Sequence, residues 1–261
     1  MTAKDVVERI RKNVGVPWNE QSYRDTFKAG DPDTEVKGIA TTFMATLDLI
    51  QRAHTAGMNF IVTHEPTFWS DADTTKGLES DPVYKFKVDF CNRNKIVVWR
   101  FHDHLHARRP DMIRAGLART LGWENYETAP DTHRYTLPPT TLGALAADIQ
   151  RRLNAKALRV VGGTDAKVST VALGVGYGIP RVSPDVDVVV GGESAEAGGP
   201  LDGAAYVADA AFLGGHKGQI ALGHALSEEP GMEDCAIWLR TFVTEVPVQW
   251  IRAGEPFWVP K

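Results

Sequence analysis

The sequence predicts an α/β fold with a largely parallel β-sheet. Short apolar stretches of strand length, such as residues 188–190, alternate along the chain with segments of helical spacing. Strands that alternate with helices in this way are typical of α/β layers, in which helices connect parallel strands. Three apolar stretches run directly into segments that contain histidine. Ligands bind at the carboxyl ends of the strands in such sheets, so these segments are where a functional site is expected.

The first half of the chain carries clear helix-start signals. Thr2 can cap a helix at the N-terminus, with Asp5 three residues later as its capping-box partner. Asp81 can cap a second helix that has Pro82 at its first position. In chain order the expected elements are a helix over residues 2–14, a strand at 36–43, a helix at 45–54, a strand at 60–62, a helix from 82, a strand at 96–101 and a helix at 110–122.

The second half starts near Pro138 and Pro139, which we take as a boundary, and we place the two lobes at residues 1–130 and 131–261. The strand–helix–strand order of residues 36–65 is loosely echoed later in the chain, which leaves an internal duplication open. The elements expected here are a helix at 141–153, an extended segment at 158–161, strands at 168–175 and 186–190, a helix at 201–213, a strand at 219–222 and a helix at 230–243.

Composition narrows the class of protein. The 261 residues carry a net charge of −4 and are 43% hydrophobic and 24% charged, which is ordinary for a globular protein and excludes a disordered chain. Mild acidity argues against general nucleic-acid binding, and no apolar stretch is long enough for a transmembrane helix. Asp5 stands where a signal peptide needs an apolar core. Two cysteines make neither a disulfide framework nor a zinc–thiolate site, so we expect a cytoplasmic protein whose metal ligands are nitrogen and oxygen.

Histidines gather at the ends of predicted strands. Of the eight histidines, five follow such ends, namely His64, His102, His104, His106 and His224. His64 is followed directly by Glu65. Imidazole together with carboxylate suits divalent first-row ions such as zinc, iron or manganese.

The spacing of these residues fits shared ligation, although a polar loop or a helix cap would explain each group alone. On a helical turn His102 and His106 share a face, whereas in an extended chain His102 and His104 would do so. His224 and Glu228 have the same separation of four residues. Together the groups supply four or five imidazoles and two carboxylates. That is too many for one tetrahedral zinc and suits two ions bridged by a carboxylate or hydroxide.

A glycine-rich segment follows the predicted strand 168–175. Gly174, Gly176 and Gly178 could let the backbone approach a phosphate. No helix clearly starts there and no Lys-Ser/Thr pair follows, so the segment is not a Walker loop.

Three segments resemble the motifs of a known family. Residues 64–69 resemble its segment of two histidines, a proline and an aromatic pair, and residues 102–106 resemble its His-Thr-Asn-Leu-Asp segment. Residues 223–228 resemble its Gly-His-x-x-Ser-Glu segment, preceded by the matching Gly-Gly-Glu at 191–193. The chain is therefore similar to the Nif-three-like dinuclear metal-centre hexameric proteins, some of which carry the name GTP cyclohydrolase 1 type 2.

The resemblance implies a three-layer α/β fold of two similar lobes, with residues from about 215 to 261 completing the metal site. It also implies a homohexameric ring. The ligands that carry over directly are His64, His102, His224 and Glu228. Glu65 stands where the family has a histidine, and His106 where it has an aspartate. One imidazole and one carboxylate have thus changed places, which preserves the ligand charge, so we expect all six residues to bind two divalent ions.

The implied activity is that of a metal-dependent hydrolase acting on a nucleotide, a phosphoester or a C–N bond. Glu228 would bridge the ions, and His104 or Glu65 would move a proton. The alternative is a non-catalytic, ring-shaped metal-binding or interaction scaffold. A barrel amidohydrolase is disfavoured because the predicted strands are too few for eight. Exchanging the two departing residues by Glu65→His/His106→Asp is expected to recover metal affinity that each single change loses.

Overall fold

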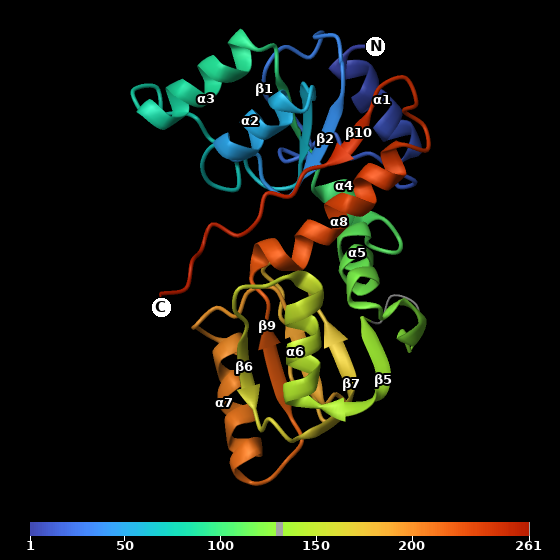
Figure 1. Cartoon of the computed structure of the whole chain (residues 1–261), viewed down its shortest axis with the longest axis vertical. Helices are drawn as coiled ribbons and strands as arrows, with labels where there is room; N and C mark the ends of the chain where they lie inside the picture. Colours follow the sequence, from blue (N-terminus) through green and yellow to red (C-terminus); the bar gives the residue numbers. More distant parts are fainter. Residues whose placement is uncertain (129–132, 261) are drawn as a thin grey trace. The chain divides into compact units, whose positions relative to one another are not determined.

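The computed structural model describes residues 1–128 and 133–260 (Figure 1). These residues form two compact units. Unit 1 comprises Met1–Met112 and Gly231–Ala253, and unit 2 comprises Ile113–Pro230 with the described residues from Gly254 onward. The predicted boundary at residues 130 and 131 lies outside the described residues. The chain passes from unit 1 to unit 2 after Met112, returns to unit 1 at Gly231 and enters unit 2 again at Gly254.

Unit 1 is built on a five-stranded sheet with the order β1-β4-β3-β2-β10. β2, β3, β4 and β10 are parallel, and β1 is an antiparallel edge strand. The strands are β1 (Phe27–Ala29), β2 (Ile39–Thr42), β3 (Phe60–Thr63), β4 (Val97–Arg100) and β10 (Val248–Trp250). Thr42 lies opposite Thr63, and Thr63 lies opposite Arg100, so the carboxyl ends of the three central strands are level.

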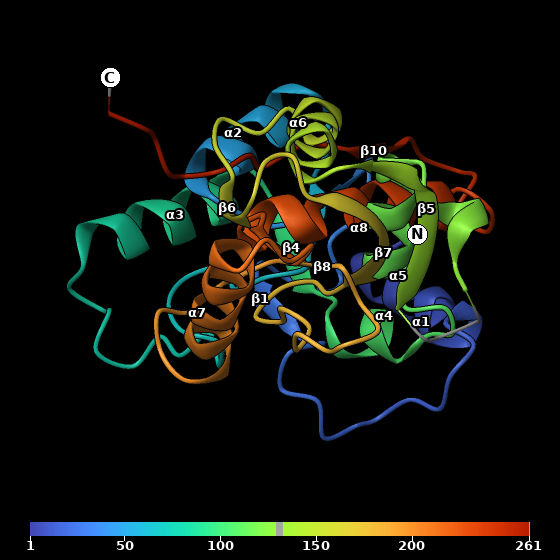
Figure 2. The same ribbon diagram turned by 90° about the horizontal axis from the view of Figure 1, so that it is seen from below.

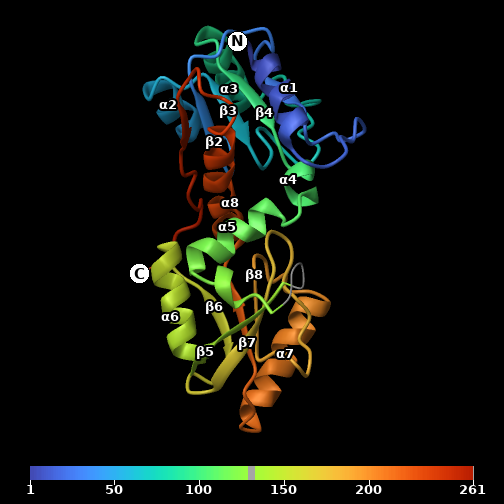
Figure 3. The ribbon, with the colours of Figure 1, turned by 90° about the vertical axis from the view of Figure 1, so that its right-hand side faces the viewer.

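Helices cover both faces of this sheet, which makes three layers, with α2 and α1 on opposite sides (Figure 3). Its helices are α1 (Ala3–Asn13), α2 (Leu47–Thr55), α3 (Pro82–Arg93), α4 (Asp103–Ala107) and the second half of α8 (His224–Leu239). Ile61 and Val98 belong to one buried cluster with Leu49 of α2 and Cys91 of α3. On the other face Thr41 donates a hydrogen bond to the carbonyl of Met232 on α8.

Unit 2 contains the second five-stranded sheet, with the order β5-β7-β8-β9-β6. β7, β8 and β9 are parallel, and both edge strands are antiparallel. The strands are β5 (Arg134–Thr141), β6 (Arg159–Gly162), β7 (Lys167–Leu173), β8 (Val188–Gly191) and β9 (Gly218–Ala221). Hydrophobic residues fill both faces of the central strands, as expected where helices cover a sheet on each side.

The helices of unit 2 also lie on both faces of their sheet (Figure 2). They are α5 (Met112–Leu121), the short 3-10 helix η1 (Glu124–Tyr126), α6 (Leu142–Leu153), α7 (Gly199–Phe212) and the first half of α8. Ile149 of α6 packs with Val188 and Val190 in one cluster. Gln219 donates to the carbonyl of Pro200 on α7, so α7 faces the opposite side. The predicted α/β fold of two three-layer lobes is confirmed.

Local signals account for most helix starts. Thr2 and Asp5 form the predicted capping box of α1, and Asp81 caps α3 by accepting from the backbone N–H of Tyr84. Thr46 caps α2 in the same way. Each of these helices begins where the sequence expected one, to within a few residues.

Two expectations for the second half were wrong. Pro138 and Pro139, where a boundary was expected, lie inside strand β5 of unit 2, at an interruption of its pairing with β7 between Thr136 and Thr140. Proline is tolerated there because β5 is an edge strand with an irregular register. The last helix begins at His224, six residues before Pro230, and runs through that proline. None of the described helices has the length and continuous apolar surface that crossing a bilayer needs.

Candidate metal centre

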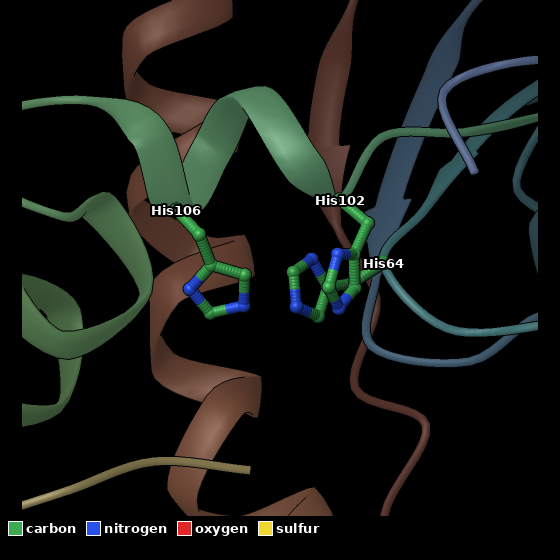
Figure 4. Close-up of side chains that lie close together, drawn as sticks. All are labelled: His64, His102 and His106. Atoms are coloured by element: carbon green, nitrogen blue, oxygen red, sulfur yellow. The ribbon is translucent and has the colours of Figure 1, made fainter. Parts of the chain in front are cut away.

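Three imidazoles converge in unit 1 at the carboxyl ends of neighbouring strands (Figure 4). His64 directly follows β3, His102 is two residues beyond the end of β4, and His106 lies one turn further on in α4. The ring centroids are 4.5 Å apart for His64 and His102, 5.0 Å for His64 and His106, and 4.8 Å for His102 and His106. One ring nitrogen from each lies within 4.8 Å of the others, a spacing that a single ion can span.

The short helix α4 sets the spacing of two of these histidines. Asp25, whose side chain is buried, accepts hydrogen bonds from the backbone N–H groups of residues 102–104. These N–H groups would otherwise lack partners at the start of a helix. Asp25 thereby starts a helical turn at His102, and the turn brings His106 onto the same side. The sequence left open whether residues 102–106 form a helical turn or an extended segment, and the structure has the helical turn.

Each imidazole of the group is oriented through its Nδ1 atom. The Nδ1 contacts are 3.1 Å from His64 to the carbonyl oxygen of Phe101, 3.0 Å from His102 to Asp103, and 3.0 Å from His106 to Asp111. Because carbonyl and carboxylate oxygens accept, Nδ1 carries the proton and Nε2 carries the lone pair. Metal-binding histidines are held in this way, by an oxygen acceptor at the nitrogen that does not bind the ion.

Electrostatics keep the central imidazole neutral. Burial, followed by the proximity of His64 and His106, lowers the pKa of His102 to about 4. A metal ion binds the neutral form of imidazole. His102 is therefore in the protonation state that ligation requires at neutral pH.

Glu65 lies beside the three imidazoles and is shared with a buried arginine. One carboxylate oxygen is 3.6 Å from Nε2 of His102, and the other is 3.1 Å from the guanidinium of Arg100. Arg100 is fully buried and also donates to the carbonyl of His64 and to the carboxylate of Asp71. Sequence reasoning missed Arg100. Its only signal was a charged residue at the end of an apolar strand, two positions before His102.

His104 has a different environment from its neighbours. Its Nδ1 donates to Asp25, and its Nε2 accepts from the backbone N–H of Asn19. The ring stacks on Trp18 with centroids 3.7 Å apart and planes 1° from parallel, and the residue is 2% exposed. The role of His104 as a proton carrier stays a prediction. Both ring nitrogens would first have to leave these partners.

In unit 2 the residues His224 and Glu228 occupy successive turns at the start of α8. His224 Nε2 is 3.1 Å from the Glu228 carboxylate, and His224 Nδ1 is 2.8 Å from the carboxylate of Glu193. Glu228 is 2% exposed. Glu193 is a second residue to which the sequence assigned no role, although it belongs to the Gly-Gly-Glu segment at 191–193. It orients His224 as the acceptors of unit 1 orient theirs.

The glycine-rich segment makes room for this pair. Gly176 has φ +61°, and a Cβ there would lie 2.3 Å from Oε1 of Glu228 and 3.3 Å from Nε2 of His224. Its N–H donates to Ser227 Oγ, and its carbonyl accepts from the N–H of Glu193. Glycine is favoured at this position by the positive φ and by Glu228, whose carboxylate a Cβ would displace.

The predicted site residues therefore fall into two donor sets. The structure brings His64, Glu65, His102 and His106 together in unit 1, and His224 with Glu228 in unit 2. Nitrogen and oxygen donors of this kind fit a divalent first-row ion. Their roles as ligands stay predictions.

Comparison with known proteins places the chain in a family. Residues 1–253 match the family model described as Duf34/NIF3 (NGG1p interacting factor 3). The chain belongs to this family. The resemblance drawn from the three sequence motifs is thereby confirmed.

Solved structures of similar proteins share the fold over nearly the whole chain. Staphylococcus aureus protein SA1388 is 18% identical with a TM-score of 0.71, and a Bacillus cereus protein related to NIF3 is 14% identical with a TM-score of 0.72. Each comparison covers 100% of this chain and 99% of the other. Reduced HcgD from Methanocaldococcus jannaschii is 19% identical with a TM-score of 0.62, over 95% of this chain and 97% of that one. No curated protein matches.

Proposed function

We propose that the protein binds two divalent metal ions per chain and uses them as a hydrolase. One observation carries the proposal. Three imidazoles in unit 1 each have Nδ1 held by an oxygen acceptor, and one nitrogen of each lies within 4.8 Å of the others. Bringing three imidazoles together in the interior removes water from their ring nitrogens, which is unfavourable. Coordination to a bound ion would compensate for that loss.

The donor count supports two ions. The six proposed ligands are His64, Glu65, His102, His106, His224 and Glu228. Four imidazoles and two carboxylates exceed what one tetrahedral ion accepts, and they suit zinc, iron or manganese. When bound, such ions lower the pKa of water and so supply hydroxide at neutral pH. The substrate class we propose is a phosphoester, or a C–N bond of a nucleotide.

The protein groups around the donors have roles of their own. Arg100 fixes one oxygen of Glu65 and leaves the other directed at His102, where it would bind the ion or accept a proton from bound water. Glu193 holds the ring of His224, and Glu228 adds the second negative charge. Burial of Glu65 and Glu228 strengthens their attraction to a cation.

Assembly into a homohexamer is the second part of the proposal. Phe212 is 90% exposed and Leu213 82% exposed at the end of α7, and Tyr206 of the same helix is 57% exposed. Exposed apolar side chains in one segment favour contact with another protein surface, here a second copy of this chain. Light scattering should give about six times the chain mass of 28.6 kDa. A stable monomer at micromolar concentration would contradict the proposed homohexamer.

The metal proposal is tested by elemental analysis after reconstitution with zinc, manganese or iron and removal of excess ion. We expect two ions per chain in the wild type and fewer in His64→Ala and in His224→Ala. His54→Ala is the matched control, because His54 is exposed on α2 and outside both donor sets. A wild-type chain that holds no ion contradicts the proposal, and one that holds a single ion reduces it to a mononuclear site.

Catalysis is tested separately from binding. The loaded wild type and loaded His54→Ala should turn over at least one member of a panel of phosphate monoesters, phosphate diesters and purine nucleotides, and His64→Ala should not. A fully loaded wild type that turns over nothing in the panel would favour the alternative, a non-catalytic metal-binding scaffold.

A further inference from the structure

A cavity of about 470 Å³ lies in unit 2 beside the carboxyl end of β7. This volume is within the range of pockets that hold small molecules, roughly 300–1,000 Å³. Its apolar wall includes Val175 and Ile179. The cavity is outside both donor sets, and all of its lining residues belong to unit 2.

The polar groups that line this cavity are cationic or neutral. They include Arg114, Arg134, Arg181 and His133, and no aspartate or glutamate is among the described lining residues. The whole chain has a net charge of −4, so three guanidinium groups around one cavity form a local concentration of positive charge. Guanidinium presents paired N–H donors that match the oxygens of phosphate.

The three arginines differ in what already holds them. Arg114 donates to Nε2 of His133 over 3.2 Å, which orients both side chains. Arg134 forms an ion pair with Asp185, and both side chains are about half exposed, so solvent weakens that pair. Arg181 is exposed and makes no hydrogen bond or ion pair with any residue that the structure describes. Its charge is therefore available to a ligand.

The neighbouring glycine loop does not supply the anion contacts. The N–H groups of Gly174 and Gly178 donate to the carbonyls of Val190 and Val175, and that of Gly176 donates to Ser227. These donors are already used within the fold, which leaves the guanidinium groups to bind an anion. The same loop lines the cavity with Gly174 and Gly178 and contacts Glu228 through Gly176.

We propose that this cavity binds the phosphate group of a small phosphorylated molecule. The phosphate would lie among the guanidinium groups of Arg114, Arg134 and Arg181, with the uncharged part of the molecule against Val175 and Ile179. Phosphate rather than carboxylate is favoured because a dianion matches several guanidinium groups better than a single charge does. The inference goes beyond the proposed function and does not depend on a bound metal.

Phosphorus NMR titration tests the proposal with two probes, inorganic phosphate and adenosine 5′-monophosphate. We expect both to bind the wild type, the monophosphate more tightly because its nucleoside can contact the apolar wall. Binding should weaken as sodium chloride is added, since exposed charges are screened. His224→Ala should bind both probes like the wild type, which separates this site from the metal proposal.

Arg181→Gln is the decisive variant, because its exposed side chain can change without disturbing the core. We expect it to weaken monophosphate binding at least about tenfold, the loss of one charge-assisted contact. Arg151→Gln on α6 is the matched control, since its side chain is 70% exposed and pairs only locally with Asp148. Equal affinity in the two variants would overturn the proposal, as would the absence of binding by both probes in the wild type.

Discussion

The two donor sets are built in opposite ways. In unit 1 the imidazoles come from the ends of two strands and from a short helix, and their acceptors are spread over Phe101, Asp103 and Asp111. In unit 2 His224 and Glu228 lie one turn apart on a single helix. The first set depends on sheet register and a buried arginine, whereas the second depends on room beside one glycine.

This difference predicts how substitutions near each donor set affect stability and metal binding. Disturbing the core of unit 1 should damage both its stability and its metal site, because Arg100 joins Glu65 to the carbonyl of His64. Changing a residue around the unit 2 pair should alter metal binding with a smaller effect on the fold.

Replacing Arg100 with methionine should lower the free energy of unfolding by about 3–5 kcal/mol, because Glu65 would keep a buried charge without its guanidinium partner. Chemical denaturation of the metal-free protein measures this. Arg52→Met is the matched control in the same unit, since Arg52 pairs with Asp48 on the surface of α2, and it should cost less than about 1 kcal/mol. Similar losses in the two variants would contradict the structural role of Arg100.

Arg100 also changes the metal affinity that we expect for the double variant Glu65→His/His106→Asp. Glu65→His/His106→Asp restores the family's charge count, but it leaves Arg100 beside an imidazole. We therefore expect the double variant to recover metal affinity only when Arg100→Met is added. A chelator competition measures the affinity. Full recovery in the double variant alone, with wild-type stability, would show that Glu65 and Arg100 act independently.

Gly176→Ala should reduce metal binding by the unit 2 pair, because the new Cβ would displace the Glu228 carboxylate. Gly214→Ala separates crowding from backbone strain, since Gly214 also has positive φ (+77°) but has nothing within 4 Å of its Cβ position. We expect the control to lose about 1–2 kcal/mol of stability and no metal. Gly176→Ala should lose little more stability than the control, because Glu228 Oε1 is the far end of a flexible side chain and can move away from the new Cβ. Unchanged metal content in Gly176→Ala would remove Glu228 from the ligand set.

The carboxylates that accept hydrogen bonds from imidazole Nδ1 atoms can be compared between the two units. Asp111→Asn in unit 1 and Glu193→Gln in unit 2 each keep the shape of the side chain and remove its charge. We expect metal affinity to fall by about 10–100-fold when such an acceptor is lost. The fall should be larger for Asp111, whose side chain is 11% exposed against 40% for Glu193. The reverse order, measured by chelator competition, would mean that burial does not set the strength of these contacts.

Much of the fold and part of the site follow from local sequence patterns. Apolar runs that end in histidine identified β3 and β4, and a separation of four residues identified the pairs His102 with His106 and His224 with Glu228. Those signals are local, so they are visible in one sequence. Weakly apolar edge strands such as β1 and β10 gave no comparable signal.

The missing parts depend on contacts between distant segments. Arg100 meets Glu65 because β3 and β4 pair in a register that sets Thr63 opposite Arg100. Asp25 starts α4 although nearly 80 residues separate it from that helix in the chain. Gly176 gains its importance only when α8 lies beside it. Spacing along the chain carries no information about any of these, because each arises from tertiary packing.

Most of unit 2 lies between the two segments of unit 1 in the chain, which has a consequence for synthesis on the ribosome. Residues 113–230 are continuous, so unit 2 has nearly all of its chain as soon as Pro230 has left the exit tunnel. Unit 1 must wait for residues 231–253, which bring half of α8 and the strand β10 that pairs with β2. Unit 1, whose first residues precede all of unit 2 in the chain, therefore stays incomplete until after most of unit 2 has been made. Until then the edge of the sheet formed by β2 lacks β10, the strand that pairs with it in the folded protein.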